Sequence, residues 1–136
     1  MHTTLEVEYA GHGKGFRVLS DGAKLRMLNL LLVRECCVCE VMQALDISQS
    51  KASRGLSALY DIGFLKMSKD GLWSLYSIDR EGIKGYQSQL IEAVKEALKD
   101  NKIVALDRER LKKAERVGAR CVRSLKGDMS CKPSSL

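Results

Sequence analysis

The sequence predicts a mainly α-helical protein of the α+β class, a winged helix-turn-helix with a two-stranded β-hairpin as its wing and long terminal helices for dimerisation. Three observations carry the prediction. Leucines recur at helical spacing over residues 25–32, the tight-turn sequence DIS at 46–48 separates two short helical segments, and KDG at 69–71 joins two runs of strand-forming residues. Helix, short helix, turn, helix and hairpin in this order are typical of the fold.

Capping residues place the helices of the N-terminal half. Ser20 or Asp21 can accept hydrogen bonds at the start of a helix that buries its leucines. A short second helix is expected over Cys37–Leu45. Ser48 then caps a third helix that continues to about Tyr60.

Strands and two further helices follow. Strand-forming residues over 64–68 and 72–78 flank an Asp-Gly step, which is a strong hairpin signal. Helical spacing returns over residues 79–98 and again over 108–126. The apolar face of residues 83–98 is wider than a chain of this size can bury within itself, so we expect a second copy to cover it in a homodimer.

The third helix carries the features of a recognition helix. Its apolar residues Ala52, Leu56 and Leu59 point inward, which turns a polar face outward near the helix N-terminus. In this fold the third helix enters the major groove, and the hairpin lies against the flanking backbone or minor groove. The residues expected to contact double-stranded DNA are Gln49, Ser50, Lys51, Ser53 and Arg54 of the helix and Lys66 and Lys69 of the hairpin.

Length, composition and charge limit the possible domain organisation. A chain of 136 residues with 45% apolar residues can fold around one core. We expect a flexible glycine-rich arm over 1–15, a DNA-binding and dimerisation domain over 16–100, and a basic helix and tail over 101–136. Residues 1–100 carry 13 basic and 13 acidic side chains, so the net charge of +6 comes from the tail and implies only non-specific attraction. Neither a membrane span nor a secretion signal is recognisable, which predicts a cytoplasmic protein without a membrane partner.

Cysteines are concentrated at one point, where Cys36, Cys37 and Cys39 occupy three of four positions. Cytoplasmic thiols stay reduced, so the cluster indicates metal ligands or reactive groups rather than disulfides. Three thiolates suit a soft trivalent centre such as arsenic or antimony. Side chains three apart share a helix face and those two apart do not, so Cys36 and Cys39 can hold one ion in an intact helix, whereas Cys37 and Cys39 cannot. Binding is therefore expected to distort this turn.

Two more cysteines lie near the C-terminus. Cys121 falls on the apolar stripe of the last predicted helix, where packing or a dimer contact is the expected role. Cys131 lies in the polar tail beyond that helix. Either one is an alternative additional ligand for an ion at the cluster.

Three stretches, LSDGAKLRMLNLLL, CCVCEVMQALDISQSKASRGLSALYDIGFL and KDGLWSLYSI, resemble the arsenic-repressor (ArsR/SmtB) family of winged-helix metal sensors over roughly residues 16–80. Cys37-Val38-Cys39, followed by an acidic residue, is similar to the metal-binding box of that family. The resemblance implies a homodimeric repressor that needs no cofactor on DNA and leaves its operator when an inducer ion binds. In the arsenic-responsive branch that ion is As(III) or Sb(III).

Two positions depart from the family pattern. Met42 stands three residues after Cys39, where members often carry a further cysteine, so the third ligand is open and Cys36 is preferred. Gly55 stands where the family commonly has histidine. A glycine inside a helix costs about 1 kcal/mol relative to alanine.

Two other functions are compatible with the residues. A thiol-based repressor of the same fold, responsive to redox state or reactive sulfur, would form a disulfide or persulfide that involves Cys121 or Cys131. A thiol-dependent enzyme is disfavoured, because the cysteines form no CxxC motif and no histidine lies near them as a base. We therefore expect a regulator and not an enzyme.

Overall fold

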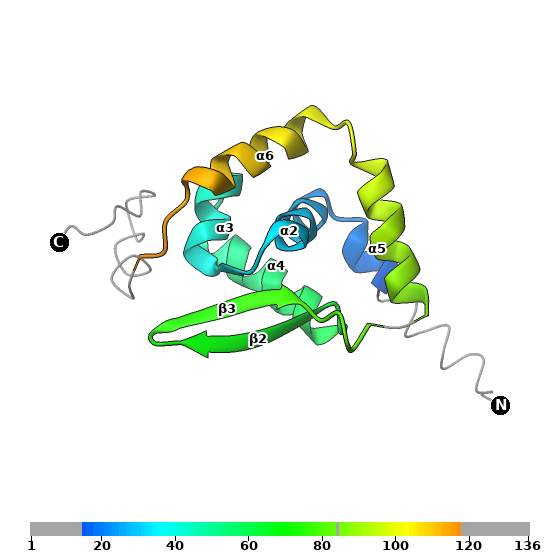
Figure 1. Cartoon of the computed structure of the whole chain (residues 1–136), viewed down its shortest axis with the longest axis horizontal. Helices are drawn as coiled ribbons and strands as arrows, with labels where there is room; N and C mark the ends of the chain where they lie inside the picture. Colours follow the sequence, from blue (N-terminus) through cyan, green and yellow to red (C-terminus); the bar gives the residue numbers. More distant parts are fainter. Residues whose placement is uncertain (1–14, 84, 118–136) are drawn as a thin grey trace.

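The computed structural model describes residues 15–83 and 85–117. Their elements are α2 (Gly22–Val33), β1 (Cys36–Cys37), α3 (Val38–Leu45), α4 (Gln49–Asp61), β2 (Leu65–Asp70), β3 (Trp73–Ile78), α5 (Tyr86–Ala97) and α6 (Lys102–Lys113). Residues 15–19 are helical as well. Figure 1 shows α2 near the middle of the molecule, with α5 and α6 on two of its sides and the β2–β3 hairpin along another. The predicted winged helix-turn-helix fold is confirmed, and none of the described helices has the length and apolar content that a membrane crossing requires.

Side-chain caps define where α2 and α4 begin. The Asp21 carboxylate accepts hydrogen bonds from two backbone N–H groups of the first turn of α2, at 2.8 and 3.2 Å. Asp21, rather than Ser20, is therefore the cap. The Ser48 hydroxyl accepts a bond from the Lys51 N–H at 3.1 Å, which starts α4 as predicted.

A short strand, β1, precedes α3 and was not predicted. β2 and β3 pair antiparallel along their whole lengths, and β1 pairs with the other edge of β3 through Cys36 opposite Tyr76 and Cys37 opposite Leu75. The predicted two-stranded hairpin is thus part of a three-stranded sheet. Cys37 has an extended backbone in β1, so α3 begins at Val38. The predicted helix over Cys37–Leu45 therefore started one residue too early.

The helix predicted over residues 79–98 begins later, at Tyr86. The Asp79 carboxylate accepts a hydrogen bond from the Gly82 N–H at 3.0 Å, which holds this stretch in a turn. Gly85 then has a φ of +56°, a left-handed conformation that interrupts a right-handed helix and favours glycine. Local turn geometry therefore overrides the helical spacing of the apolar residues.

The last predicted helix, residues 108–126, is also placed differently. α6 starts after Asn101, whose side chain accepts a hydrogen bond from the Val104 N–H at 3.0 Å, and it ends at Lys113. Ala114 has an extended backbone, and residues 114–117, which we call the strap, run on as neither helix nor strand. Residues 118–126 of that prediction lie outside the described residues, as does most of the predicted arm over 1–15.

The main core lies between α2, α3, α4 and the sheet. Its fully buried side chains include Met27, Leu28, Leu30, Val41, Leu56, Leu59 and Phe64. α6 joins this core through Leu111 and is fixed to α2 by Arg26, whose guanidinium donates two hydrogen bonds of 2.8 Å to the fully buried Asp107 carboxylate. The packing of α6 on α2 and α3 places the strap beside the start of α3.

Candidate functional site

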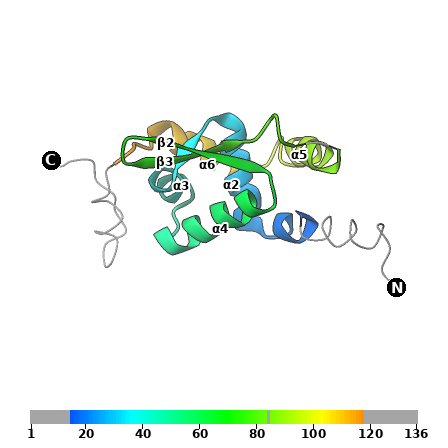
Figure 2. The ribbon, with the colours of Figure 1, turned by 90° about the horizontal axis from the view of Figure 1, so that it is seen from below.

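α4 presents the polar face that was predicted to contact DNA. Its inward residues Ala52, Leu56 and Leu59 are fully buried, as predicted. The outward residues are Ser50, Lys51 and Arg54, which are exposed, and Gln49 and Ser53, which are half-buried. Figure 2 shows α4 along an edge of the molecule, with α2 and α3 on one side of it. Among the described residues, the other side of α4 is left uncovered.

The hairpin adds a second basic element. Lys66 and Lys69 of β2 are exposed, and the Lys69 ammonium donates a 3.0 Å hydrogen bond to the Ser74 hydroxyl of β3. Leu72 at the hairpin turn is 80% exposed. The hairpin thus carries an apolar residue at its tip, with Lys69 and the acidic Asp70 near it and Lys66 farther along β2.

Two of the three clustered thiols meet at the start of α3. Cys37 is the N-cap residue of α3 and Cys39 lies in its first turn, and their side chains share a hydrogen bond. Both are buried, in a small cluster with Leu75 and Val117. The prediction that these two thiols cannot share one ion in an intact helix took Cys37 to lie inside the helix, whereas Cys37 is the N-cap residue before it. The extended backbone of the N-cap residue turns its side chain toward Cys39.

Cys36 lies apart from this pair. It is fully buried in the main core, and its Sγ lies 3.5 Å from the carbonyl oxygen of Arg34. Consecutive residues of a strand point to opposite faces, which explains why Cys36 and Cys37 belong to different clusters. Cys121 and Cys131 lie outside the described residues. Within residues 15–83 and 85–117, no three His, Cys, Asp or Glu side chains are grouped to hold a metal ion.

The electrostatics of the thiols differ from one cysteine to the next. The hydrogen bond from Cys39 lowers the pKa of Cys37, helped by the backbone N–H of Glu40 and opposed by burial. The same hydrogen bond raises the pKa of Cys39, and burial raises it further, because its ionisation would place a second negative sulfur beside the first. Burial, together with the Glu40 charge, raises the pKa of Cys36 to about 12. Cys37 is therefore the thiol that ionises first.

Glu40 connects the thiol pair to its surroundings. The residue is 3% exposed, and its carboxylate accepts hydrogen bonds from the Cys37 N–H at 2.9 Å, from Arg34 at 2.7 Å and from Arg116 at 3.1 Å. Burial alone would raise the pKa of Glu40, but these three donors outweigh it and bring the pKa below its ordinary value. The carboxylate thus ties the end of β1 and the start of α3 to the strap.

The strap crosses directly over the thiol pair. The Gln43 amide donates to the Glu115 carbonyl at 2.8 Å and accepts from the Glu115 N–H at 3.1 Å. The indole N–H of Trp73, in β3, donates to the carbonyl of Val117. Val117 is 6% exposed and packs in the cluster of Cys37 and Cys39. The strap therefore joins α3 to the hairpin through the thiol cluster.

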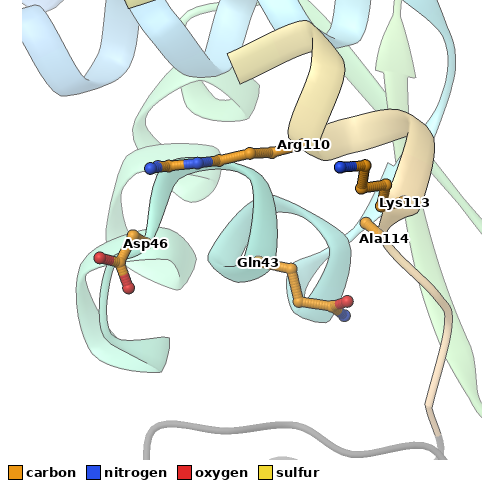
Figure 3. Close-up of a pocket in the computed structure, with 5 residues that line it drawn as sticks. All are labelled: Gln43, Asp46, Arg110, Lys113 and Ala114. Carbon is orange, nitrogen blue, oxygen red and sulfur yellow. The ribbon is translucent and has the colours of Figure 1, made fainter. Parts of the chain in front are cut away.

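An open pocket lies beside the strap, between the C-terminal ends of α3 and α6. Figure 3 shows its lining residues, Gln43, Asp46, Arg110, Lys113 and Ala114, with the Arg110 guanidinium extending over α3 toward Asp46. Its volume is about 340 Å³. Its lining has two basic residues and one acidic residue, and none of the lining residues carries sulfur, so the pocket offers no ligand for a soft ion. The thiol pair is accordingly the candidate site for a soft ion.

Comparison with known proteins finds similar regulators. The model of a family described as bacterial regulatory proteins of the arsR family matches residues 21–66. The arsenic resistance transcriptional regulator ArsR1 of Pseudomonas putida is 41% identical over 68 residues, which are 48% of this chain and 52% of that protein. The arsenical resistance operon repressor of Bacillus subtilis is 31% identical over 75 residues, 54% of this chain and 71% of that protein. The chain thus spans about half the length of the Pseudomonas relative.

A solved structure supports the fold independently. It is the solution structure of a homodimeric winged helix-turn-helix DNA-binding domain from Mycobacterium bovis, described as a possible ArsR-family regulator. It matches with a TM-score of 0.62 and 20% identity, over 75% of this chain and 91% of that one. These matches are with regulators rather than enzymes, in agreement with the prediction from the sequence.

Proposed function

This chain belongs to the ArsR family of bacterial regulatory proteins, and we propose that it is a cytoplasmic repressor that leaves operator DNA when trivalent arsenic or antimony binds its thiols. The observation that carries the proposal is the hydrogen-bonded pair of Cys37 and Cys39 at the start of α3. Residues 46–48 alone separate α3 from α4, so a shift of α3 is passed directly to the DNA-contacting helix. The names of the two arsenic-related proteins support this choice of ion.

On DNA, the protein needs no bound cofactor in this proposal. α4 enters the major groove with Lys51 and Arg54 toward bases and phosphates, and the Lys66 and Lys69 side chains of the hairpin contact the flanking backbone. The partner is double-stranded operator DNA. Gln49, Ser50 and Ser53 complete the predicted contact face.

The proposed assembly is a homodimer formed through α5. Its residues Ile91 and Val94 are covered by the chain's own core, so less of its apolar stripe is free than the sequence suggested. Phe16 is 56% exposed and lies beside Tyr86, with ring centroids 6.2 Å apart. Figure 1 places α5 at the edge of the molecule opposite the hairpin tip, where a partner leaves the DNA-contacting elements free. Sedimentation as a monomer at micromolar concentration would contradict the dimer.

The test is fluorescence anisotropy of the reduced protein on a labelled duplex from upstream of its own gene. We expect tight binding, release by arsenite or antimonite, and no release by zinc or peroxide. The Cys37→Ser and Cys39→Ser variants should stay bound when arsenite is added. Release by peroxide alone would favour the redox-responsive repressor, and absence of binding to this duplex would contradict the operator assignment.

A further inference from the structure

We propose that the strap is an autoinhibitory cover, which must leave the pair of Cys37 and Cys39 before a soft ion can bind there. This inference rests on the proposed function, because it concerns how the ion reaches the same two thiols. It adds a conformational step to that function. The protein then has a closed form, which the structure describes, and an open form in which the strap has released α3 and the hairpin.

The first support is the burial of the thiol pair. Neither Cys37 nor Cys39 is more than 4% exposed, and both pack with Leu75 of β3 and Val117 of the strap. An ion that binds both sulfurs needs space beside them, and close-packed protein interiors contain few voids larger than a water molecule. A neighbour of the pair must therefore move before two sulfurs can bind one ion.

The strap is the neighbour that can leave at the smallest cost. Leu75 and Trp73 belong to β3, which is paired on one edge with β1 and on the other with β2. The strap is neither helix nor strand, and side chains hold it in place. Gln43 makes two hydrogen bonds to the backbone of Glu115, and Trp73 makes one to the carbonyl of Val117. Segments without a backbone ladder open locally, at free energies below that of global unfolding.

The buried carboxylate of Glu40 stays paired when the strap leaves. It keeps the hydrogen bonds from Arg34 at 2.7 Å and from the Cys37 N–H at 2.9 Å, and neither donor belongs to the strap. Only the 3.1 Å bond from Arg116 is lost, and the Arg116 side chain is already partly exposed to water. Opening therefore avoids the large cost of leaving a buried charge without a partner.

The ion and the Val117 side chain compete for the space beside the two sulfurs. Each As–S bond replaces one hydroxyl group of As(OH)₃, which leaves as water with the thiol proton, so arsenic stays trivalent. Binding at the pair traps the open form, and the apparent affinity is reduced by the fraction of molecules that are open. A change that weakens the strap should therefore raise both the apparent affinity and the rate of ion entry.

Opening also loosens the hairpin. In the closed form, Arg116 of the strap lies 3.8 Å from the Asp70 carboxylate at the hairpin end of β2. The Trp73 indole of β3 donates to the carbonyl of Val117. Both contacts are lost when the strap leaves. The hairpin is one of the two proposed DNA-contacting elements, so the cover adds a second route from ion to DNA besides α3.

The first test measures access to the thiols in the absence of an ion. The reduced full-length protein is treated with iodoacetamide, and mass spectrometry follows alkylation of each cysteine. Val117→Ala removes buried carbon atoms from the closed form only, so it should raise the alkylation rate of Cys37 about tenfold. Cys36, which is buried in the main core, should react no faster, because the core stays closed. Val33→Ala, the same change at an exposed valine of α2, should leave both rates unchanged.

The second test is a stopped-flow titration with arsenite, followed by the emission of Trp73, the single tryptophan of the chain. Because opening precedes binding, the observed rate should rise with arsenite concentration and level off at the rate of opening. This plateau should be about tenfold higher in Val117→Ala. The indole loses the Val117 carbonyl in the open form, so its emission should shift to longer wavelength as arsenite binds.

The outcomes separate this inference from the proposed function. Equal alkylation rates of Cys37 in Val117→Ala and in the parent overturn the cover and leave the sensor intact. Equal acceleration at Cys36 and Cys37 also overturns it, because the variant then opens globally. An entry rate that stays proportional to arsenite, with the same slope in both proteins, has the same meaning. A parent that binds no arsenite, in which Val117→Ala still accelerates alkylation, overturns the proposed ion and confirms that the strap covers the thiols.

Discussion

Replacing Gly55 with alanine should destabilise the protein, although Gly55 lies inside a helix. It occupies the buried side of α4, where the Met27 side chain of α2 packs directly against it. A Cβ at this position would lie 2.5 Å from the Met27 Cε and closer still to its Sδ, whereas ordinary contacts begin near 3.4 Å. The end of Met27 would have to move by about 1 Å, and Met27 is fully buried in the core.

Two opposing terms set the size of the effect. Replacing glycine with alanine in a helix interior stabilises the helix by about 1 kcal/mol. Overpacking of a close-packed core costs about 1–3 kcal/mol. Since the contact is far shorter than van der Waals distance and Met27 is enclosed, we expect Gly55→Ala to lower the free energy of unfolding by about 1 kcal/mol. That loss corresponds to a fall in Tm of about 4 °C for a chain of 136 residues.

Urea unfolding of matched variants isolates the steric term. Gly22→Ala is the control, because a Cβ on Gly22 at the start of α2 meets no atom within 4 Å, and it should be neutral or stabilising. Met27→Ala should cost about 2–5 kcal/mol alone, and combining it with Gly55→Ala should recover about 1–2 kcal/mol relative to the sum of the single changes. If Gly55→Ala stabilises the protein by the full helical gain of about 1 kcal/mol, packing against Met27 is not the reason for this glycine.

Three further changes test other contacts. Glu40→Gln should lower Tm at neutral pH, and the difference should shrink as the pH falls below the unfolded pKa of about 4.3. The reason is that a carboxyl with a lowered folded pKa stabilises above its unfolded pKa and loses this effect as the pH falls through the folded value; a pH-independent difference would contradict this. Asp107→Asn should lower the free energy of unfolding in urea by about 2–3 kcal/mol. This is less than for a fully buried ion pair, because the Arg26 side chain is 30% exposed. A change below about 0.5 kcal/mol would refute the stabilising role of this ion pair. Lys51→Ala should weaken DNA binding and reduce the number of counterions released on binding, measured from the salt dependence of the affinity, by about one. Lys112→Ala on α6 should change neither quantity in the same anisotropy titration.

Elements with strong local signals were predictable from the sequence. The Ser48 cap and the inward spacing of Ala52, Leu56 and Leu59 define α4, and the Asp-Gly step defines the hairpin. By contrast, β1 contains two residues, and its extended conformation depends on pairing with β3, which no local pattern encodes. The placement of Cys37 beside Cys39 could not be predicted for this reason, because it depends on β1.

The environment of the thiols was missed for the same reason. Gln43, Trp73 and Arg116 act through contacts with distant parts of the chain, and their sequence neighbourhoods do not reveal them. Glu40 did leave a signal. Its spacing from Cys37 is that of a capping box, with cysteine in the place usually taken by serine or threonine, and the structure has this arrangement. Reading cysteine as a capping residue would have started α3 at Val38.

The contacts that hold α6 and the strap join residues 44 to 81 positions apart in the chain. Contacts of this kind form late in folding, because a long loop must close before they are made. During synthesis the elements from α2 to β3 leave the ribosome before α6 and the strap do, since a chain emerges from its N-terminus. For that interval Cys37 and Cys39 lack the cover of Val117, so the nascent chain is the form of the protein in which this pair is most open to oxidants and soft ions.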